Sequence, residues 1–326
     1  MESDRTIRTI GILTSGGDAP GMNGVIRAVT RTAINYGLRV MGIRRGYHGL
    51  WRGDMEELDA RSVSDTSRVG GTFLMTARSK TFATPEGVEK AVKMARVFGL
   101  DAIITVGGDG TMRGAGDLAR QGVPVVHVPA TIDNDVGCTD YTVGFDTALN
   151  TAIDCVDKLR DTASSHERCS VIEVMGREAG YLAFHVGIAT GAEIILIPEQ
   201  PLDKDKDIIG KILSARNRGK RHYIVVVAEG AAKGEEVAKQ IEEDTGTEAR
   251  ATVLGYLQRG GHPTYLDRYR SSMFGILAVK SLLDGRMNRV TVMKKGEIID
   301  IDLFEGLKEI KTITQEDFKQ ARILSI

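Results

Sequence analysis

Aspartates grouped with glycines are the residues of this chain best suited to chemistry. The segment Gly107–Thr111, GGDGT, follows an apolar run and precedes a stretch with helical spacing. Glycines at a strand-to-helix turn let the backbone approach a phosphate closely, and the helix start offers free N–H groups. A carboxylate beside bound phosphates needs a cation, and Mg²⁺ takes one or two carboxylates plus phosphate oxygens. The motif therefore favours a phosphate site with Asp109 on Mg²⁺ over a tight turn with a solvated aspartate.

A second acidic group, TIDND at 131–135, follows another apolar run. Two carboxylates one residue apart can divide the work, because one accepts a proton while the other fixes a metal or a lysine. The alternative is a turn in which Asp and Asn side chains cap neighbouring amides. Beside Asp109, a base plus a metal carboxylate is the minimum set for moving a phosphoryl group onto a hydroxyl.

Arginines stand at expected loop positions between these groups. Guanidinium forks bind phosphate oxygens bidentately and stabilise negative charge, although a single arginine is more often a surface charge. The candidates are Arg78, Arg168, Arg177, Arg250 and Arg259. Arg177 and Arg259 are favoured because each lies next to a glycine turn. Two further basic clusters, Arg27 with Arg31 and Arg218 with Lys220 and Arg221, leave open a solvated face or a binding site.

Short apolar runs and helical segments must position these groups. Runs of four to six residues rich in Val and Ile, without alternation, are typical of strands buried on both faces. We expect such strands at Ile10–Leu13, Ile103–Val106, Val125–Val128, Val171–Met175, Ile194–Ile197, Ile224–Val227 and Val290–Met293. Helical spacing, with proline near several starts and glycine past several ends, predicts helices at Met22–Tyr36, Glu86–Phe98, Asp146–Leu159, Asp207–Arg216, Glu235–Glu243 and Tyr269–Leu283. This alternation indicates an α/β protein with parallel sheets, whose ligands bind beyond the carboxyl ends of the strands.

Several other chemistries lack their motifs. No GxxxxGK[ST] loop occurs, and the glycine pattern from Gly108 is one residue off the dinucleotide fingerprint, which counts against a nicotinamide oxidoreductase. The sequence contains neither HExxH nor GxSxG, so a zinc site and a serine hydrolase have no support.

Composition excludes some partners and compartments. The 326 residues carry 43 Lys and Arg against 44 Asp and Glu, so no overall charge favours nucleic acid or a membrane surface. Three cysteines without a CxxC pair argue for a reducing compartment. The amino terminus does not resemble a signal peptide, and no apolar stretch approaches the ~18 residues of a membrane span. We expect a cytoplasmic protein that binds neither nucleic acid nor membrane.

Taken together, five segments resemble the bacterial ATP-dependent 6-phosphofructokinases. They are TSGGDAPGMN at 14–23, GGDGT at 107–111, PATIDND at 129–135, MGREAG at 175–180 and LQRGG at 257–261, in the order of that family. The resemblance covers essentially the whole chain. It implies two Rossmann-like three-layer α/β/α domains with mainly parallel sheets and the active site in the cleft between them. The larger, ATP-binding domain is expected at 1–142 plus 257–306, and the smaller, sugar-phosphate-binding domain at 143–256 plus 307–326.

The resemblance also implies the reaction and its residues. The family uses Mg²⁺ and transfers the γ-phosphoryl of ATP to the 1-hydroxyl of fructose 6-phosphate, a committed step of glycolysis. The positions that match ATP contacts are Gly17, Arg78, Ser79, Gly108, Asp109, Gly110 and Thr111, with Asp109 on the metal. Asp133 matches the catalytic base, while Thr131, Arg177 and Arg78 match the residues that act on the phosphoryl group.

Sugar and effector positions follow from the same resemblance. The sugar-phosphate positions are Thr131, Ile132, Asp133, Arg168, Met175, Gly176, Arg177, Glu229, Arg250, Tyr256, Leu257, Gln258 and Arg259. Arg168 and Arg250 match arginines that reach a neighbouring subunit's site, which implies a homotetramer with shared active sites. A subunit-interface site for ADP, an activator, and phosphoenolpyruvate, an inhibitor, is matched by Arg27, Arg31, Arg61, Arg160, Gly191, Glu193, Arg218, Lys220, Arg221 and His222.

Three departures from the family pattern bear on function. Tyr256 stands where a histidine is common among the 6-phosphate ligands, and Ala130 replaces a glycine. Ala60 stands where an effector-site arginine is usual; Arg61 beside it is expected to compensate only in part, because neighbours on an extended segment point to opposite sides. Relatives that use diphosphate carry Lys at the position of Ala130 and Asp at that of Gly110, so ATP is the favoured donor.

Other functions stay open as alternatives. The nearest is a kinase of the same fold that uses diphosphate or another sugar phosphate. A non-catalytic metabolite-binding regulator would be expected to lack the base, the metal carboxylate or the arginine, yet all three are present. Lipid or NAD kinases share GGDGT but do not explain TIDND or LQRGG.

Overall fold

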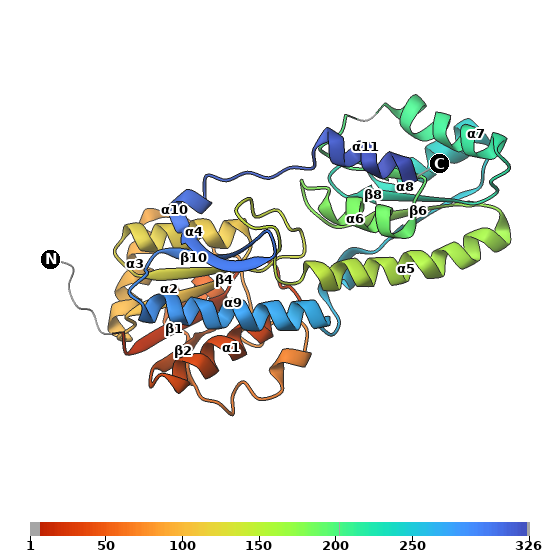
Figure 1. The fold of residues 1–326 in the computed structure, drawn as a ribbon. Helices are drawn as coiled ribbons and strands as arrows, with labels where there is room; N and C mark the ends of the chain where they lie inside the picture. The colour runs from red at the N-terminus through yellow and green to blue at the C-terminus, as the bar shows by residue number, and fades with distance from the viewer. Residues whose placement is uncertain (1–6, 202, 325–326) are drawn as a thin grey trace. The chain divides into compact units, whose positions relative to one another are not determined.

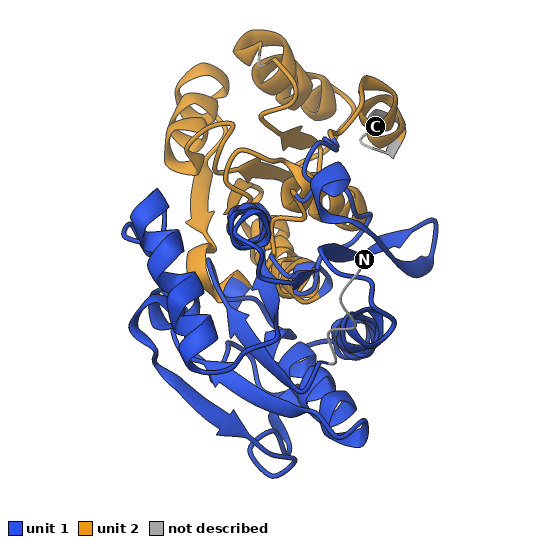
Figure 2. Ribbon diagram, turned by 90° about the vertical axis from the view of Figure 1, so that its left-hand side faces the viewer, with its two compact units in different colours: residues 1–131, 136–146, 259–311 blue, residues 132–135, 147–258, 312–326 orange. Residues whose placement is uncertain are grey.

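The computed structural model describes residues 7–201 and 203–324, which form two compact units. The first unit extends to Thr131 and also takes in Val136–Asp146 and Arg259–Lys311; the second contains Ile132–Asp135, Thr147–Gln258 and the chain from Thr312 onward. Figure 2 colours the two units separately. Each unit is therefore assembled from stretches that are distant in sequence.

The first unit is built on a seven-stranded sheet in the order β11-β10-β5-β4-β1-β2-β3. Its strands are β1 (Thr9–Thr14), β2 (Arg39–Ile43), β3 (Met55–Leu58), β4 (Ala102–Gly107), β5 (Val125–Pro129), β10 (Arg289–Lys294) and β11 (Glu297–Asp302). The central strands are parallel, and the two edge strands β3 and β11 are antiparallel to their neighbours. The four apolar runs predicted as strands in this unit are confirmed, and β1, β4 and β5 are buried along their length.

Helices cover this sheet (Figure 1). They are α1 (Met22–Asn35), α2 (Gly46–Arg52), the 3₁₀ turn η1 (Thr66–Arg68), α3 (Pro85–Val97), α4 (Asp109–Arg120), α9 (Tyr265–Leu283) and α10 (Leu303–Gly306). Helices α1 and α9 pack together, with Gly275 close against Ala28. A continuous apolar core joins the sheet to α2, α3 and α4 through residues such as Leu13, Ile103 and Leu118.

The second unit holds a four-stranded parallel sheet in the order β7-β8-β6-β9. Its strands are β6 (Cys169–Val174), β7 (Ile194–Leu196), β8 (Tyr223–Ala228) and β9 (Ala249–Val253). The helices that belong to it or lead into it are α5 (Phe145–His166), α6 (Tyr181–Thr190), the π turn η2 (Asp205–Ile209), α7 (Gly210–Asn217), α8 (Gly234–Thr245), the 3₁₀ turn η3 (Gly255–Arg259) and α11 (Gln315–Leu324). Its core is a cluster of apolar side chains such as Val225, Ile212 and Ile241. The two sheets confirm the predicted α/β class.

Several local predictions need correction. Arg250, expected in a loop, lies within β9. Helix α9 begins at Tyr265 rather than Tyr269, because the Thr264 hydroxyl accepts the Asp267 amide and caps the helix there. Ala60 and Arg61 lie in a turn rather than an extended segment, so alternation of side chains does not apply to them. Among the described residues, no helix is long and apolar enough to cross a membrane.

Candidate active site

The glycine-rich segments of the first unit meet at one edge of its sheet. Strands β1, β4 and β5 are parallel neighbours, with Thr14 opposite Val106 and Gly107 opposite Pro129, so the loops that follow them start side by side. The Thr111 hydroxyl donates to the Ser15 carbonyl over 2.9 Å, which ties the loop after β4 to the loop after β1. The edge predicted to bind a ligand is therefore formed by GGDGT together with the loop after β1.

The GGDGT segment forms the start of a helix. Gly108 is the N-cap of α4 and Asp109 its first residue, so free N–H groups and a carboxylate stand at the same end. The Asp109 carboxylate is partly exposed and accepts Arg113 Nε at 2.8 Å. A Cβ built on Gly110 would meet nothing within 4 Å in the described part of the chain. The fold itself therefore does not require glycine at 110; the missing side chain leaves room for a ligand.

Gly17 is held against an arginine from the far end of the sequence. Arg259 Nη1 donates to the Asp18 carbonyl at 2.9 Å, and a Cβ on Gly17 would lie only 2.2 Å from that nitrogen. Glycine at 17 therefore permits a close approach of the guanidinium. The structure thus brings together an expected ATP position and an expected sugar-phosphate position.

Arg78 and Ser79 lie in an irregular segment between η1 and α3. Arg78 is exposed, and the Ser79 hydroxyl accepts the Phe82 amide at 3.1 Å. Sequence reasoning missed Tyr47, which stacks on Phe82 with 4.1 Å between ring centroids and donates to the Thr111 carbonyl at 2.6 Å. Burial raises the pKa of Tyr47, so its phenol remains a donor. The sequence feature that could have indicated Tyr47 is its position as an aromatic residue between two glycines, Gly46 and Gly49.

A buried charge pair is the central feature of the second unit. Asp133 is fully buried, and its Oδ2 lies 3.3 Å from Nε of Arg177, whose side chain is about half exposed. Thr131, two residues earlier and assigned to the first unit, is nearly buried, and its carbonyl accepts the Thr142 hydroxyl at 2.7 Å. An acid side chain kept from water beside a cation is suited to accept a proton from a bound hydroxyl.

Glu229 fixes the backbone around Arg177. One carboxylate oxygen of Glu229 accepts the Gly176 and Arg177 amides, at 3.2 and 2.8 Å. Arg177 has φ +55°, and Gly176 has φ +140°. A non-glycine residue in the left-handed region needs such support. Glu229, expected as a sugar contact, thus also orients the arginine.

The expected 6-phosphate residues differ in their surroundings. Arg168 and Arg250 both approach the Glu248 carboxylate, at 3.8 and 2.9 Å, so a single carboxylate pairs with both arginines. Tyr256 is 82% exposed and Leu257 is also exposed, whereas Gln258 is fully buried. Met175 lies just past β6 and is half-buried. The Ile132 side chain is fully buried, which leaves its backbone for any contact with a sugar.

Part of the expected effector set clusters in the second unit. Glu193 is buried, accepts the Ile224 amide at 2.6 Å and pairs with Lys220. Arg160 donates to the Thr190 carbonyl, directly before Gly191, which caps α6. The other members are partly exposed or exposed: Arg218 on Ser214, Arg221 on Glu167, His222, and in the first unit Arg27, Arg31 and Arg61.

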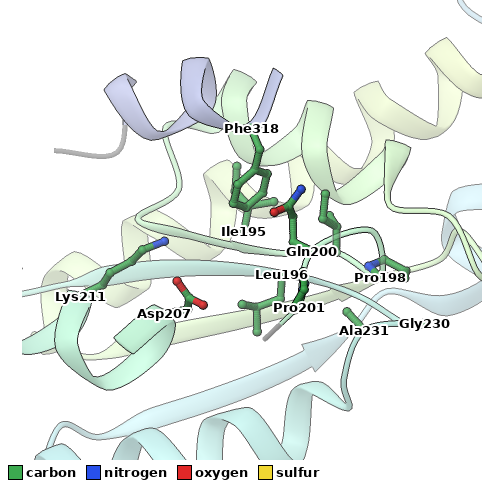
Figure 3. A pocket seen from close by; sticks show the side chains of 11 residues that line it. Ile195, Leu196, Pro198, Gln200, Pro201, Asp207, Lys211, Gly230, Ala231 and Phe318 are labelled. Carbon is green, nitrogen blue, oxygen red and sulfur yellow. The ribbon is translucent and has the colours of Figure 1, made fainter. Parts of the chain in front are cut away.

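Two further features of the structure bear on the site. In residues 7–201 and 203–324 no group of three or more His, Cys, Asp and Glu side chains could hold a metal. A cavity of about 210 Å³ lies in the second unit, walled mainly by apolar side chains of β7, the following segment and α11, with Asp207 and Lys211 along one side (Figure 3). It contains none of the residues expected to bind substrate, so the chemical groups above mark the candidate site.

These features define an enzyme class. A glycine-rich helix start with a carboxylate, and a buried aspartate beside an arginine, are parts used in phosphoryl transfer. The chain belongs to the phosphofructokinase family, because the family model "Phosphofructokinase" matches residues 9–282. The resemblance drawn from the five segments is thereby confirmed.

Individual relatives agree with this membership. The chain is 51% identical over 319 residues to the ATP-dependent 6-phosphofructokinase of Clostridium botulinum strain Loch Maree, covering 98% of this chain and 100% of the relative. It is 48% identical over 320 residues to the protein of that name from Clostridioides difficile strain 630, at the same coverage.

Solved structures show the same fold. Pichia pastoris phosphofructokinase has a TM-score of 0.90 and 35% identity, with 99% of this chain covering 38% of that longer one. A pyrophosphate-dependent phosphofructokinase from Marinobacter aquaeolei has a TM-score of 0.85 at 22% identity, covering 98% and 91% of the two chains, which is evidence of fold alone.

Proposed function

We propose that this chain transfers the γ-phosphoryl group of ATP to the 1-hydroxyl of fructose 6-phosphate, producing fructose 1,6-bisphosphate and ADP. Curated relatives about half identical over their full length carry the name of this activity. The observation that carries the residue assignment is the fully buried Asp133 beside Arg177. We infer that the first unit binds ATP and that the second unit supplies most of the sugar-phosphate contacts.

Asp133 acts as the general base. Its carboxylate takes the proton of the sugar 1-hydroxyl as that oxygen attacks the γ-phosphorus and the bond to the β–γ bridging oxygen breaks. Burial excludes water, and the guanidinium at 3.3 Å places a positive charge beside the carboxylate. Arg177 then interacts with the phosphoryl oxygens in transfer, aided by Thr131 and Arg78.

The donor is ATP rather than diphosphate. Space at Gly110 is open, and Ala130 is fully buried, so a lysine at 130 would place its charge and volume inside the protein. Neither the Asp at 110 nor the Lys at 130 that marks diphosphate users is present. The space beside Gly110 therefore remains open for the nucleotide.

Asp109 fits a Mg²⁺ ion that arrives with the nucleotide. It offers one partly exposed carboxylate at a helix start, and Mg²⁺ is commonly held by one or two carboxylates plus phosphate oxygens. When bound, the ion neutralises charge on the β- and γ-phosphate oxygens. The N–H groups at the start of α4 orient the same phosphates.

The fructose 6-phosphate end is bound by arginines and by the tip of η3. Arg168 and Arg250, which both pair with Glu248, bind the 6-phosphate in the active site of a neighbouring subunit of a homotetramer. Arg259 and Tyr256 bind the 6-phosphate in the active site of their own subunit. ADP and phosphoenolpyruvate act as effectors at the basic residues around Glu193 and Lys220. The three free cysteines suit a cytoplasmic enzyme.

A coupled assay tests this function. Wild-type protein is given fructose 6-phosphate with either ATP or diphosphate, with and without Mg²⁺, and fructose 1,6-bisphosphate is measured. We expect product only with ATP and Mg²⁺. Turnover with diphosphate, or with another sugar phosphate in preference, would replace this proposal by the alternative kinase of the same fold.

A further inference from the structure

The segment Val69–Thr76, here called the strap, leads from η1 to Arg78 without forming a helix or a strand. The Arg45 amide donates to its Leu74 carbonyl at 2.8 Å, and side chains from elsewhere hold the rest of its course. Its placement matters, because Arg78 and Ser79 follow it directly.

One buried amide side chain holds the first half of the strap. Asn23, 2% exposed on the first turn of α1, donates from Nδ2 to the Val69 and Gly70 carbonyls at 3.0 and 3.2 Å. Its Oδ1 accepts the Phe73 amide at 2.9 Å. Three backbone groups of the strap thus bind a single side chain.

The chemistry of these partners selects asparagine. Two carbonyls require donors and one amide requires an acceptor, which a primary amide supplies at once. Aspartate of the same size would accept from Phe73 but face two carbonyl oxygens with negative charge. An aliphatic side chain would leave all three partly buried backbone groups without this partner.

The second half of the strap is fixed to the loop that carries Gly17. The Thr14 hydroxyl bonds to the Thr72 hydroxyl at 2.8 Å and donates to the Met75 carbonyl at 3.0 Å. The Thr76 hydroxyl donates to the Gly16 carbonyl at 2.7 Å. The path from Asn23 to Arg78 is therefore short and held at both ends.

We propose that Asn23 is a positioning residue for the nucleotide site: its amide sets the strap, and the strap places Arg78 and Ser79 against the phosphates of ATP. This inference rests on the proposed function, because it takes Arg78 as an ATP residue. Asn23 itself touches no reacting atom. Its effect reaches the nucleotide through the hydrogen bonds to Val69, Gly70 and Phe73.

The test compares Asn23→Asp with wild type by kinetics and by amide hydrogen exchange. A charge-assisted hydrogen bond contributes roughly 1.5–3 kcal/mol, so a misplaced Arg78 should raise the KM for ATP about tenfold or more. We expect the KM for fructose 6-phosphate to stay within about twofold. Exchange in a peptide covering 68–78 should become faster, and MgATP should slow it less than in wild type.

A matched control loses comparable bonds at the opposite end of the sheet. Asp101 accepts the Arg8 and Thr9 amides at 2.8 and 2.9 Å, ahead of β1 and β4. Asp101→Ala should lower the melting temperature and leave the KM for ATP unchanged. If Asn23→Asp does not fold, Thr76→Val releases the strap at its other end and should change the same two readouts.

The outcomes separate this inference from the proposed function. A normal KM for ATP in variants whose strap exchanges faster would overturn the positioning role of Asn23. Unchanged exchange in the strap would overturn it as well. Failure of the wild-type protein to use ATP would instead reject the proposed function, while hydrogen exchange would still report whether Asn23 holds the strap.

Discussion

The Nε atom of Arg177 lies 3.3 Å from Oδ2 of the fully buried Asp133. The position of Arg177 depends on its backbone as well as on charge. Its amide donates to Glu229, and Arg177 adopts φ +55°. A flexible arginine would need to be ordered during each turnover, whereas this one starts next to the proposed base. The site is therefore preorganised by residues on three separate segments.

Tyr256 tests how the 6-phosphate is bound. Its phenol can donate one hydrogen bond, while the guanidinium groups of Arg168, Arg250 and Arg259 carry the positive charge. A neutral hydrogen bond contributes about 0.5–1.5 kcal/mol, so Tyr256→Phe should raise the KM for fructose 6-phosphate about two- to tenfold. The kcat should change little. An unaltered KM would mean that this exposed hydroxyl makes no contact with the phosphate.

Ala60 tests the effector site. It lies exposed in a turn where the Asp59 carboxylate accepts the Arg61 and Ser62 amides, so Ala60→Arg should not perturb the fold. One added charge-assisted hydrogen bond should lower the midpoints for ADP and phosphoenolpyruvate by about tenfold. Fructose 6-phosphate saturation across an effector series measures this, with Arg61→Ala as the control. Midpoints that stay in place would show that position 60 does not limit effector binding.

His127 predicts a pH dependence of stability. It is fully buried in β5, where its Nδ1 bonds to the Thr105 hydroxyl at 2.9 Å, and burial lowers its pKa to about 3. Because the unfolded pKa is ~6.5, the folded state favours the neutral ring. Its contribution to stability is complete above pH 6.5 and is lost as the pH falls toward 3, by at most about 1.4 kcal/mol per pH unit.

Urea unfolding at pH 7 and pH 5 measures this contribution. His127→Asn keeps a polar group for Thr105 but cannot gain a proton, so its free energy of unfolding should fall less between the two pH values. Equal losses in wild type and variant would contradict the assignment to His127.

Sequence patterns predicted the central strands and pointed to the charged groups of the proposed site, but not the edge strands or the supporting residues. Uninterrupted Val and Ile runs are visible because β1, β4, β6 and β8 are buried on both faces. Strand β11 mixes acidic and apolar residues at the edge of its sheet, and β9 carries Arg250, so neither forms such a run. Asp109 and Arg177 were proposed from residue type and neighbouring glycines, and Asp133 from its place in the TIDND segment.

The supporting residues were not predictable in the same way. Asn23 and Tyr47 act on backbone groups about 50 and 64 positions away, and only the tertiary structure shows those partners. Their side chains are also common in helices and cores without any such role. The charges of a site are thus easier to predict from sequence than the residues that hold them in place.

The most direct test of the account is the kcat of Asp133→Asn with MgATP and fructose 6-phosphate. This change keeps the shape of the side chain and removes the proton acceptor, and general-base catalysis typically contributes ~10²–10⁴-fold. We predict that kcat falls by at least about a hundredfold while fructose 6-phosphate binding, measured without turnover, is largely retained. A variant with near-normal kcat would contradict the assignment of Asp133 as the base.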